Sequence, residues 1–156
     1  MPFAPIRASL SRGCAALLLL LLLTLFFAVQ PVRASLFQFE GPLPADLGVR
    51  NGALAACTST AHCSRRDWAT ADPTAALAAL LPSVLRLDGI AIVETGNGYL
   101  HATATSRLFG FVDDLELFAD SAHQTLQARS ASRLGDSDLG VNAKRLDTLQ
   151  QALKAS

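Results

Sequence analysis

The stretch VLRLDGIAIVETGNGYLHATATSRL, residues 84–108, decides the fold class, because two alternating runs flank Asn97-Gly98 in it. Alternation of polar and apolar residues is the period of a half-buried β-strand. Asn-Gly between two such runs is the strongest short signal for a β-hairpin with a two-residue turn. Such a turn pairs Glu94 with His101, so the two side chains lie opposite each other.

The same register predicts which residues face the core. It places Val93 opposite Ala102 and Ala91 opposite Ala104. The side chains expected to face inward are Leu100, Ala102 and Ala104. Their odd-numbered neighbours, His101 among them, then face outward.

A second hairpin is expected from FVDDLELFAD, residues 111–120, and HQTLQARSAS, residues 123–132. A two-residue loop between them sets Asp114 opposite Arg129. Opposite charges across an antiparallel pair support this register, because each pair contributes about 0.2–1 kcal/mol. A shift by one residue would turn these charges into the core.

Two helices frame the hairpins. The first begins with Asp72 as cap and Pro73 at the first helical position, and it is expected to end before Pro82. Its inward-facing residues are expected to be Leu77, Leu80 and Leu81. The C-terminal helix is expected to begin at Asp138, with Ser137 as the alternative cap. Its apolar stripe is expected to comprise Leu139, Ala143, Leu146, Gln150 and Leu153.

These elements predict an α+β domain over residues 57–156. It consists of a four-stranded antiparallel meander sheet, with a short N-terminal helix and a C-terminal helix packed on one face. Residues 64–72 are expected to be a polar loop around Trp68. Residues 35–56 are expected to be an extended lead-in, whose apolar residues dock onto the domain: Leu36, Phe37 and Phe39.

The N-terminus has the layout of a secretory signal peptide. Residues 13–29, GCAALLLLLLLTLFFAV, carry no charge, and two arginines precede them. The small residues that end at Ala34 favour cleavage there, so residues 1–34 are expected to be removed. An uncleaved anchor is the alternative, because the run is nearly long enough to span a bilayer. Either way the protein is expected to be exported, with membrane association if the segment stays attached.

Charge and cysteine content limit the functional classes. Without residues 1–34 the chain has 10 basic and 13 acidic residues, a balance that does not favour nucleic-acid binding. Cys57 and Cys63 remain after cleavage, and in an oxidising compartment they are expected to form a disulfide. No metal site and no cofactor is expected.

The segment RSASRLGDSDLGVNAKR, residues 129–145, is the candidate site. Together with the acidic pair in FVDDLELF it is expected to form one charged strand-loop-helix patch. The proposed ligand-binding residues are Asp113, Asp114, Arg129, Ser130, Ser132, Arg133, Asp138, Asn142 and Arg145. Arginines beside a helix start can hold a carboxylate or phosphate.

The pairings within this segment admit more than one reading. Asp136 or Asp138 is expected to pair with Arg133, and Asp113 is expected to lie beside Ser130 on the inner face. A buried aspartate at the edge of a pocket would have a raised pKa. His101 opposite Glu94 is a further arrangement for a general base, although it is more often a surface pair.

The strings FGFVDDLELF and RSASRLGDSDLGVNAKRLDTL resemble the family catalogued as domain of unknown function 1499, over roughly residues 48–153. The resemblance maps onto Ser106, Phe109, Phe111, Asp113, Asp114, Arg129, Ser130, Ser132, Arg133, Gly135, Asp138, Gly140, Asn142 and Arg145. It implies no reaction. It fits an exported protein of the periplasm or the thylakoid lumen.

Three functions therefore stay open. The first is a binding module for a small anionic ligand or an envelope or membrane partner. The second is a hydrolase-like enzyme that uses Asp113 or Asp114 with Arg129, Arg133 and Ser130. The third is a structural or assembly factor at a membrane. The sequence does not decide whether the protein is an enzyme.

Overall fold

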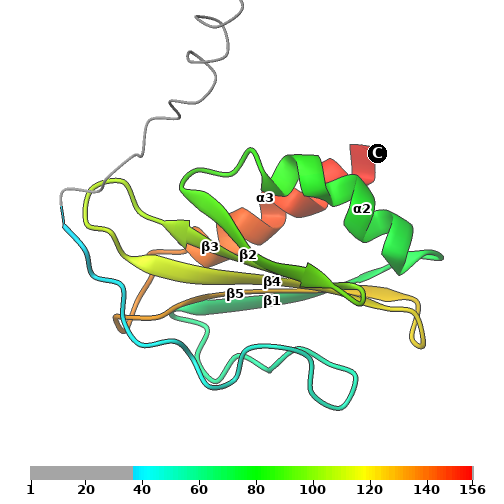
Figure 1. Ribbon diagram of the computed structural model, residues 1–156, viewed down its shortest axis with the longest axis horizontal. Coiled ribbons are helices and arrows are strands. Elements are labelled where there is room, and N and C mark those ends of the chain that lie inside the picture. The colour runs from blue at the N-terminus through cyan, green and yellow to red at the C-terminus, as the bar shows by residue number, and fades with distance from the viewer. Residues whose placement is uncertain (1–36, 156) are drawn as a thin grey trace, which may run out of the picture. The chain divides into compact units, whose positions relative to one another are not determined.

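The computed structural model describes residues 37–155, and these form an antiparallel sheet with two helices on one face (Figure 1). The strands are β1 (Cys63–Ala69), β2 (Ile90–Gly96), β3 (Tyr99–Thr105), β4 (Val112–Asp120) and β5 (Thr125–Ser132). The helices are α2 (Pro73–Val84) and α3 (Val141–Ala155). The predicted signal peptide or anchor, residues 1–34, and Leu36 lie outside the described residues. The α+β class is confirmed, but the sheet has five strands instead of four, in the order β1-β5-β4-β3-β2.

The additional strand is β1, which falls where a polar loop was expected. Its sequence CSRRDWA pairs antiparallel with β5, with Arg65 opposite Arg129. Trp68 is buried on the side of the helices, because it lies on the same face as Leu126. Charged residues conceal the strand pattern here, and they are common on edge strands because they discourage pairing with other chains.

The first hairpin has the expected turn and one irregularity. Glu94 lies opposite His101 as predicted, but a β-bulge between Ile92 and Glu94 shifts the rest of the pair. Ile92 therefore lies opposite Ala102, and Ala91 opposite Thr103, so the predicted partners of Val93 and Ala91 are wrong. A bulge adds one unpaired residue to a strand, and sequence alternation does not reveal it. The predicted inward-facing residues of β3 are all buried: Leu100, Ala102 and Ala104.

The second hairpin has a longer turn than expected, over residues 121–124. Gln124 takes a positive φ of 51° there. The pairing moves by two residues, so Glu116, not Asp114, lies opposite Arg129. Because side chains alternate with a period of two, a two-residue shift changes the partners but keeps every side chain on its predicted face.

Helix α2 begins as predicted but continues past Pro82. The Asp72 carboxylate accepts the N–H of Ala75 at 2.9 Å, which confirms the cap. The last turn brings Val84 fully into the core, whereas Leu81 is 38% exposed, contrary to the prediction. Proline removes one helical hydrogen bond, and the burial of Val84 offsets that loss.

Helix α3 starts later than predicted. The Asp138 carboxylate accepts the N–H groups of Gly140 and Asn142, so it caps the helix start, but from two residues before Gly140, whose carbonyl accepts the N–H of Lys144. Leu139 does not belong to the buried stripe: it has a φ of 54° and is 94% exposed. Leu146 and Leu149 are the fully buried leucines of this helix, and the predicted stripe omitted Leu149.

The hydrophobic core lies between the sheet and the two helices. Its fully buried members come from every layer: Val84, Ala102, Leu115, Leu117, Leu126, Ala128, Leu146 and Leu149. Residues 37–56, here called the lead-in segment, run along the opposite face of the sheet (Figure 1). Their one bridge pairs Arg50 with Ala53. The sheet is therefore covered on both faces, by helices on one and by extended chain on the other.

Candidate functional site

The family-like string RSASR lies on β5, and strand alternation divides it between the two faces of the sheet. Arg129 lies beside Glu116 on the lead-in face, and Arg133, just past the end of the strand, bonds Asp114 on that face. Ser130 and Ser132 bond residues of α3 on the helix face. The expected single patch is therefore wrong. There are two polar networks, separated by the sheet.

The outer network, on the lead-in face, has Asp114 and Arg133 at one centre. Two guanidinium nitrogens of Arg133, Nε and Nη2, donate to the two oxygens of Asp114, each at 2.8 Å. The side chains are 6% and 1% exposed, respectively. His101 Nε2 lies 2.8 Å from the same carboxylate. Glu40 of the lead-in segment lies 3.5 Å from Arg133. Asp136 and Asp138, the predicted partners, do not pair with this arginine.

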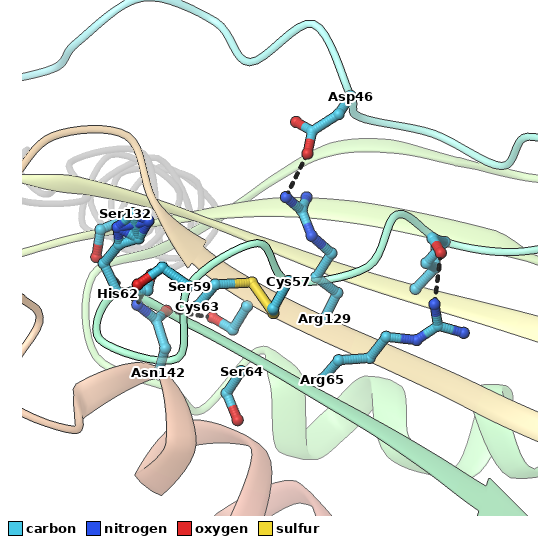
Figure 2. The surroundings of a disulfide bond; sticks show 12 residues. Asp46, Cys57, Ser59, His62, Cys63, Ser64, Arg65, Arg129, Ser132 and Asn142 are labelled. Carbon is cyan, nitrogen blue, oxygen red and sulfur yellow. Dashed lines mark hydrogen bonds and ion pairs between the residues drawn. A yellow bond between two sulfur atoms is a disulfide. The ribbon is translucent and has the colours of Figure 1, made fainter. Parts of the chain in front are cut away.

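The second centre of the outer network is Glu116, which is fully buried. One of its oxygens accepts Nη1 of Arg129 at 2.8 Å. The other accepts the Tyr99 hydroxyl at 2.8 Å and the backbone N–H of Gly48 at 2.7 Å. The second nitrogen of Arg129 bonds Asp46 at 2.6 Å (Figure 2). Arg129 and Arg133 thus each connect a carboxylate of β4 with a carboxylate of the lead-in segment.

The protonation states follow from these contacts. Burial by itself raises the pKa of the Asp114 carboxyl, but hydrogen bonds from Arg133 and His101 and their charges outweigh it and hold the pKa below its usual value. Burial and the bond to Glu116 raise the pKa of Tyr99. The bond to Asp114 raises the pKa of Arg133. Asp114 is therefore a carboxylate at neutral pH, and a lowered pKa does not suit a general acid.

His101 has a different partner from the one expected. Its Cα lies opposite that of Glu94, but its ring bonds Asp114 of β4, and Glu94 is exposed. The predicted outward-facing surface pair is therefore wrong: His101 is buried beside the lead-in face. The cause is the lead-in segment, because it covers the face of the sheet that was expected to be exposed (Figure 1).

The inner network joins β4, β5 and α3 on the helix face. Ser130 donates to the side-chain oxygen of Asn142 at 2.6 Å. One guanidinium nitrogen of Arg145 donates to the Ser130 hydroxyl oxygen and to the Asn142 side-chain oxygen. Its second nitrogen donates to Asp113 at 2.8 Å. Asp113 also accepts the Ser132 hydroxyl at 2.6 Å. Asp113 is therefore beside Ser132, not Ser130 as predicted, and this follows from the two-residue shift of the hairpin.

The backbone N–H groups at the start of α3 also bond a carboxylate of the protein itself. The Asp138 carboxylate takes the N–H groups of Gly140 and Asn142 at 2.8 and 3.0 Å. Burial raises the pKa of Asp138, but these backbone donors and the Asn142 side chain lower it to below the usual value. A ligand anion at this position would compete with a resident carboxylate.

The disulfide between Cys57 and Cys63 is present, as predicted, with 5.6 Å between the Cα atoms. It ties the end of the lead-in segment to the first residue of β1, and Figure 2 shows it close to Arg65 and Arg129. Arg65 donates to the backbone oxygen of Leu54 at 2.7 Å. Covalent and polar contacts thus hold the same segment against the sheet.

Several residues of the outer network were absent from the predicted set: Glu40, Asp46, Tyr99, His101 and Glu116. The sequence could have indicated Glu116, because it lies two positions from Asp114 in β4 and alternate residues of a strand share a face. No sequence pattern indicates which residues of the lead-in segment reach the sheet. Their contacts depend on how that segment crosses the strands.

A separate open groove of about 600 Å³ lies where α2 and α3 meet the end of β1. Trp68 lines it, and the buried indole Nε1 has no hydrogen-bond partner. Within residues 37–155, no helix is long and apolar enough to cross a membrane. In the same part of the chain, no group of three or more His, Cys, Asp or Glu side chains is placed to hold a metal ion.

Comparison with known proteins gives a family and nothing more specific. No curated protein and no solved structure shows a detectable match. Residues 52–153 match the model of the family described as Protein of unknown function (DUF1499). This match covers both hairpins, both helices and the residues of the two polar networks from β1 onward. The chain belongs to the DUF1499 family.

Proposed function

We propose that this protein is an exported, non-catalytic module that serves as a structural or assembly element at a membrane. In this proposal the charged family motif braces the fold and does not bind a ligand. The observation that carries the proposal is the pairing of the motif arginines with carboxylates of the protein itself. Arg129, Arg133 and Arg145 each donate to a carboxylate of β4, and these carboxylates are buried or nearly so.

The pairing leaves little capacity for a small anion. A guanidinium that recognises a ligand carboxylate or phosphate presents a pair of N–H groups to it. In Arg133 that pair is directed at Asp114. The helix start that would assist it is filled by Asp138. An incoming anion would have to displace resident carboxylates, which weakens the anion-binding alternative.

The enzyme alternative has a similar difficulty. A general base works best when its pKa lies near the working pH. The contacts of Asp114 lower its pKa, and the carboxylate is committed to two cationic or hydrogen-bonding partners. Ser130, the nucleophile in that alternative, is fully buried and donates to Asn142.

The location at a membrane rests on the sequence of the N-terminus. The uncharged run over residues 13–29 is suited to export, whether it is removed or stays as an anchor. The intact disulfide is consistent with an oxidising compartment, since such bonds are rare where thiols are kept reduced. The compartment proposed is the periplasm, or the thylakoid lumen in a photosynthetic source.

A native mass spectrum of the protein purified from its own host tests the proposal. We expect a mass that shows an oxidised Cys57–Cys63 pair and no bound small molecule. The mass also reports whether the chain begins at Ser35. A bound mass that is lost in a folded Arg133→Lys variant would overturn the bracing role and establish a ligand site. Lysine keeps the charge but cannot form the two-point contact.

A further inference from the structure

Four phenylalanines form an exposed aromatic surface at one end of the sheet. Phe37 and Phe39 come from the lead-in segment, and Phe109 and Phe111 from the loop between β3 and β4. Each ring lies 5.4–6.2 Å from its neighbours, measured between centroids. Their exposed fractions are 39–53%. We call these four residues, together with the equally exposed Leu108, the phenylalanine patch.

The patch is built on ordered backbone. The amide of Ser106 donates to Phe111 O at 2.8 Å, and the Ser106 hydroxyl accepts the amide of Phe111 at 3.0 Å. The amide of Gly110 donates to Ser106 O. The other half contacts the outer network at Glu40, next to Phe39; the Glu40 side chain is 74% exposed, and its carboxylate lies 3.5 Å from Arg133. Aromatic residues are thus displayed by a preorganised loop and a braced segment.

This surface is larger than chance exposure explains. Single exposed apolar residues are ordinary, but five contiguous ones that are about half exposed amount to an area on the order of 400 Å². The largest apolar patch on a monomer is often functional, and this patch has a comparable size. The rings stack on each other while their outer faces stay in water, so a partner that removes them from water is favoured.

Two features indicate what covers the patch. In the form that keeps residues 1–34 as an anchor, the apolar run ends at residue 29, eight residues before Phe37, so the two are at most about 29 Å apart along the chain. The charges are also suitable. Arg107 is exposed at the tip of the loop, and Glu40, the one acid within residues 37–41 and 106–111, pairs with Arg133. An apolar surface with an exposed arginine at its edge suits an anionic bilayer interface.

We propose that the phenylalanine patch docks onto the lipid surface, with the rings at the level of the headgroups and Arg107 on the anionic phosphates. In this proposal the outer network helps to position Phe37 and Phe39 beside Phe109 and Phe111. This inference rests on the proposed function and names its partner as the bilayer itself.

The test uses the full chain reconstituted in vesicles of phosphatidylcholine and phosphatidylglycerol, with and without bromine on the acyl chains. Phe109→Trp reports on the patch, and the buried Trp68 of the unmodified chain supplies the background signal. Ala122→Trp is the matched control. It lies in the turn at the other end of the nine-residue β4, roughly 30 Å away. We expect brominated lipid to quench the Phe109→Trp emission at least about two-fold and to leave Ala122→Trp unchanged, because interfacial groups reach only the outer acyl region.

Equal quenching at both positions, or none at Phe109→Trp, would overturn the inference. A blue-shifted, lipid-independent emission would also overturn it. It would assign the patch to a second copy if it depends on protein concentration, and to the chain's own N-terminal run if it does not. If Phe109→Trp does not fold, Leu108→Trp takes its place in the same loop. Failure here leaves the proposed function standing, because that is decided by the bound mass and the Arg133→Lys variant.

Discussion

Replacing Arg133 by methionine removes one partner of one of the two buried arginine–carboxylate pairs in the outer network. Asp114 stays behind, 1% exposed, with the His101 ring as its remaining close partner. Removing one member of a buried pair costs about 3–5 kcal/mol, because the other charge is left uncompensated. We therefore expect Arg133→Met to lose about 3–5 kcal/mol of unfolding free energy at neutral pH. That is a large part of the roughly 5–15 kcal/mol of an ordinary domain.

The loss should depend on pH with a defined sign. In the native protein the pKa of Asp114 is lowered by Arg133 and His101. Its contribution is present above the unfolded pKa of about 3.9 and is lost as the pH falls through the lower folded value. In the variant, burial raises the pKa of the unpaired carboxyl, so protonation relieves the cost as the pH falls. The titratable and charged groups at this carboxylate are His101, Arg133 and, beyond Arg133, Glu40.

Urea denaturation at pH 7 and at several lower values measures both effects. Asp147→Asn is the control: it removes the carboxylate of an exposed pair with Arg66, at 3.4 Å, and should cost about 0–1 kcal/mol. The difference between Arg133→Met and the native protein should shrink steadily toward pH 3. The bracing argument is refuted if Arg133→Met costs no more than Asp147→Asn, or if its cost is the same at every pH.

Four further variants test the fold, each by urea denaturation against the native chain. Cys57→Ser with Cys63→Ser should lose about 2 kcal/mol, because the bond closes only a short loop; an unchanged midpoint would contradict a formed disulfide. Gly52→Ala should cost about 1–2 kcal/mol for its positive φ alone. Gly89→Ala should cost about 1–3 kcal/mol more, because its Cβ would meet a strand oxygen at 2.1 Å, and equal losses at the two glycines would argue against that packing. Leu146→Ala should lose about 2–5 kcal/mol from the filled core, whereas a loss under 1 kcal/mol would place it outside the core.

The candidate site was only partly predictable from the motif. Alternation correctly separated Arg129 and Arg133 from Ser130 and Ser132. The expectation of one patch nevertheless failed, because the two sets of side chains bond to different layers on opposite faces of the sheet. Asp138 was assigned its capping role from local sequence, since a cap and its backbone donors lie within one helical turn. Arg133 was given the wrong acid, since its partner Asp114 comes from another strand.

By itself the sequence determined what depends on neighbours along the chain. The alternating runs around Asn97-Gly98, the Asp72 and Asp138 caps and the short Cys57–Cys63 loop follow from local geometry, so the α+β class, two hairpins and two helices could be derived. The tertiary structure alone decided the fifth strand, the register of the second hairpin and the pairing of each arginine. Those features depend on contacts between distant segments, such as Arg65 opposite Arg129. An additional edge strand, a four-residue turn or a covering segment changes which residues pair with each other. None of them changes the alternation of polar and apolar residues along the sequence.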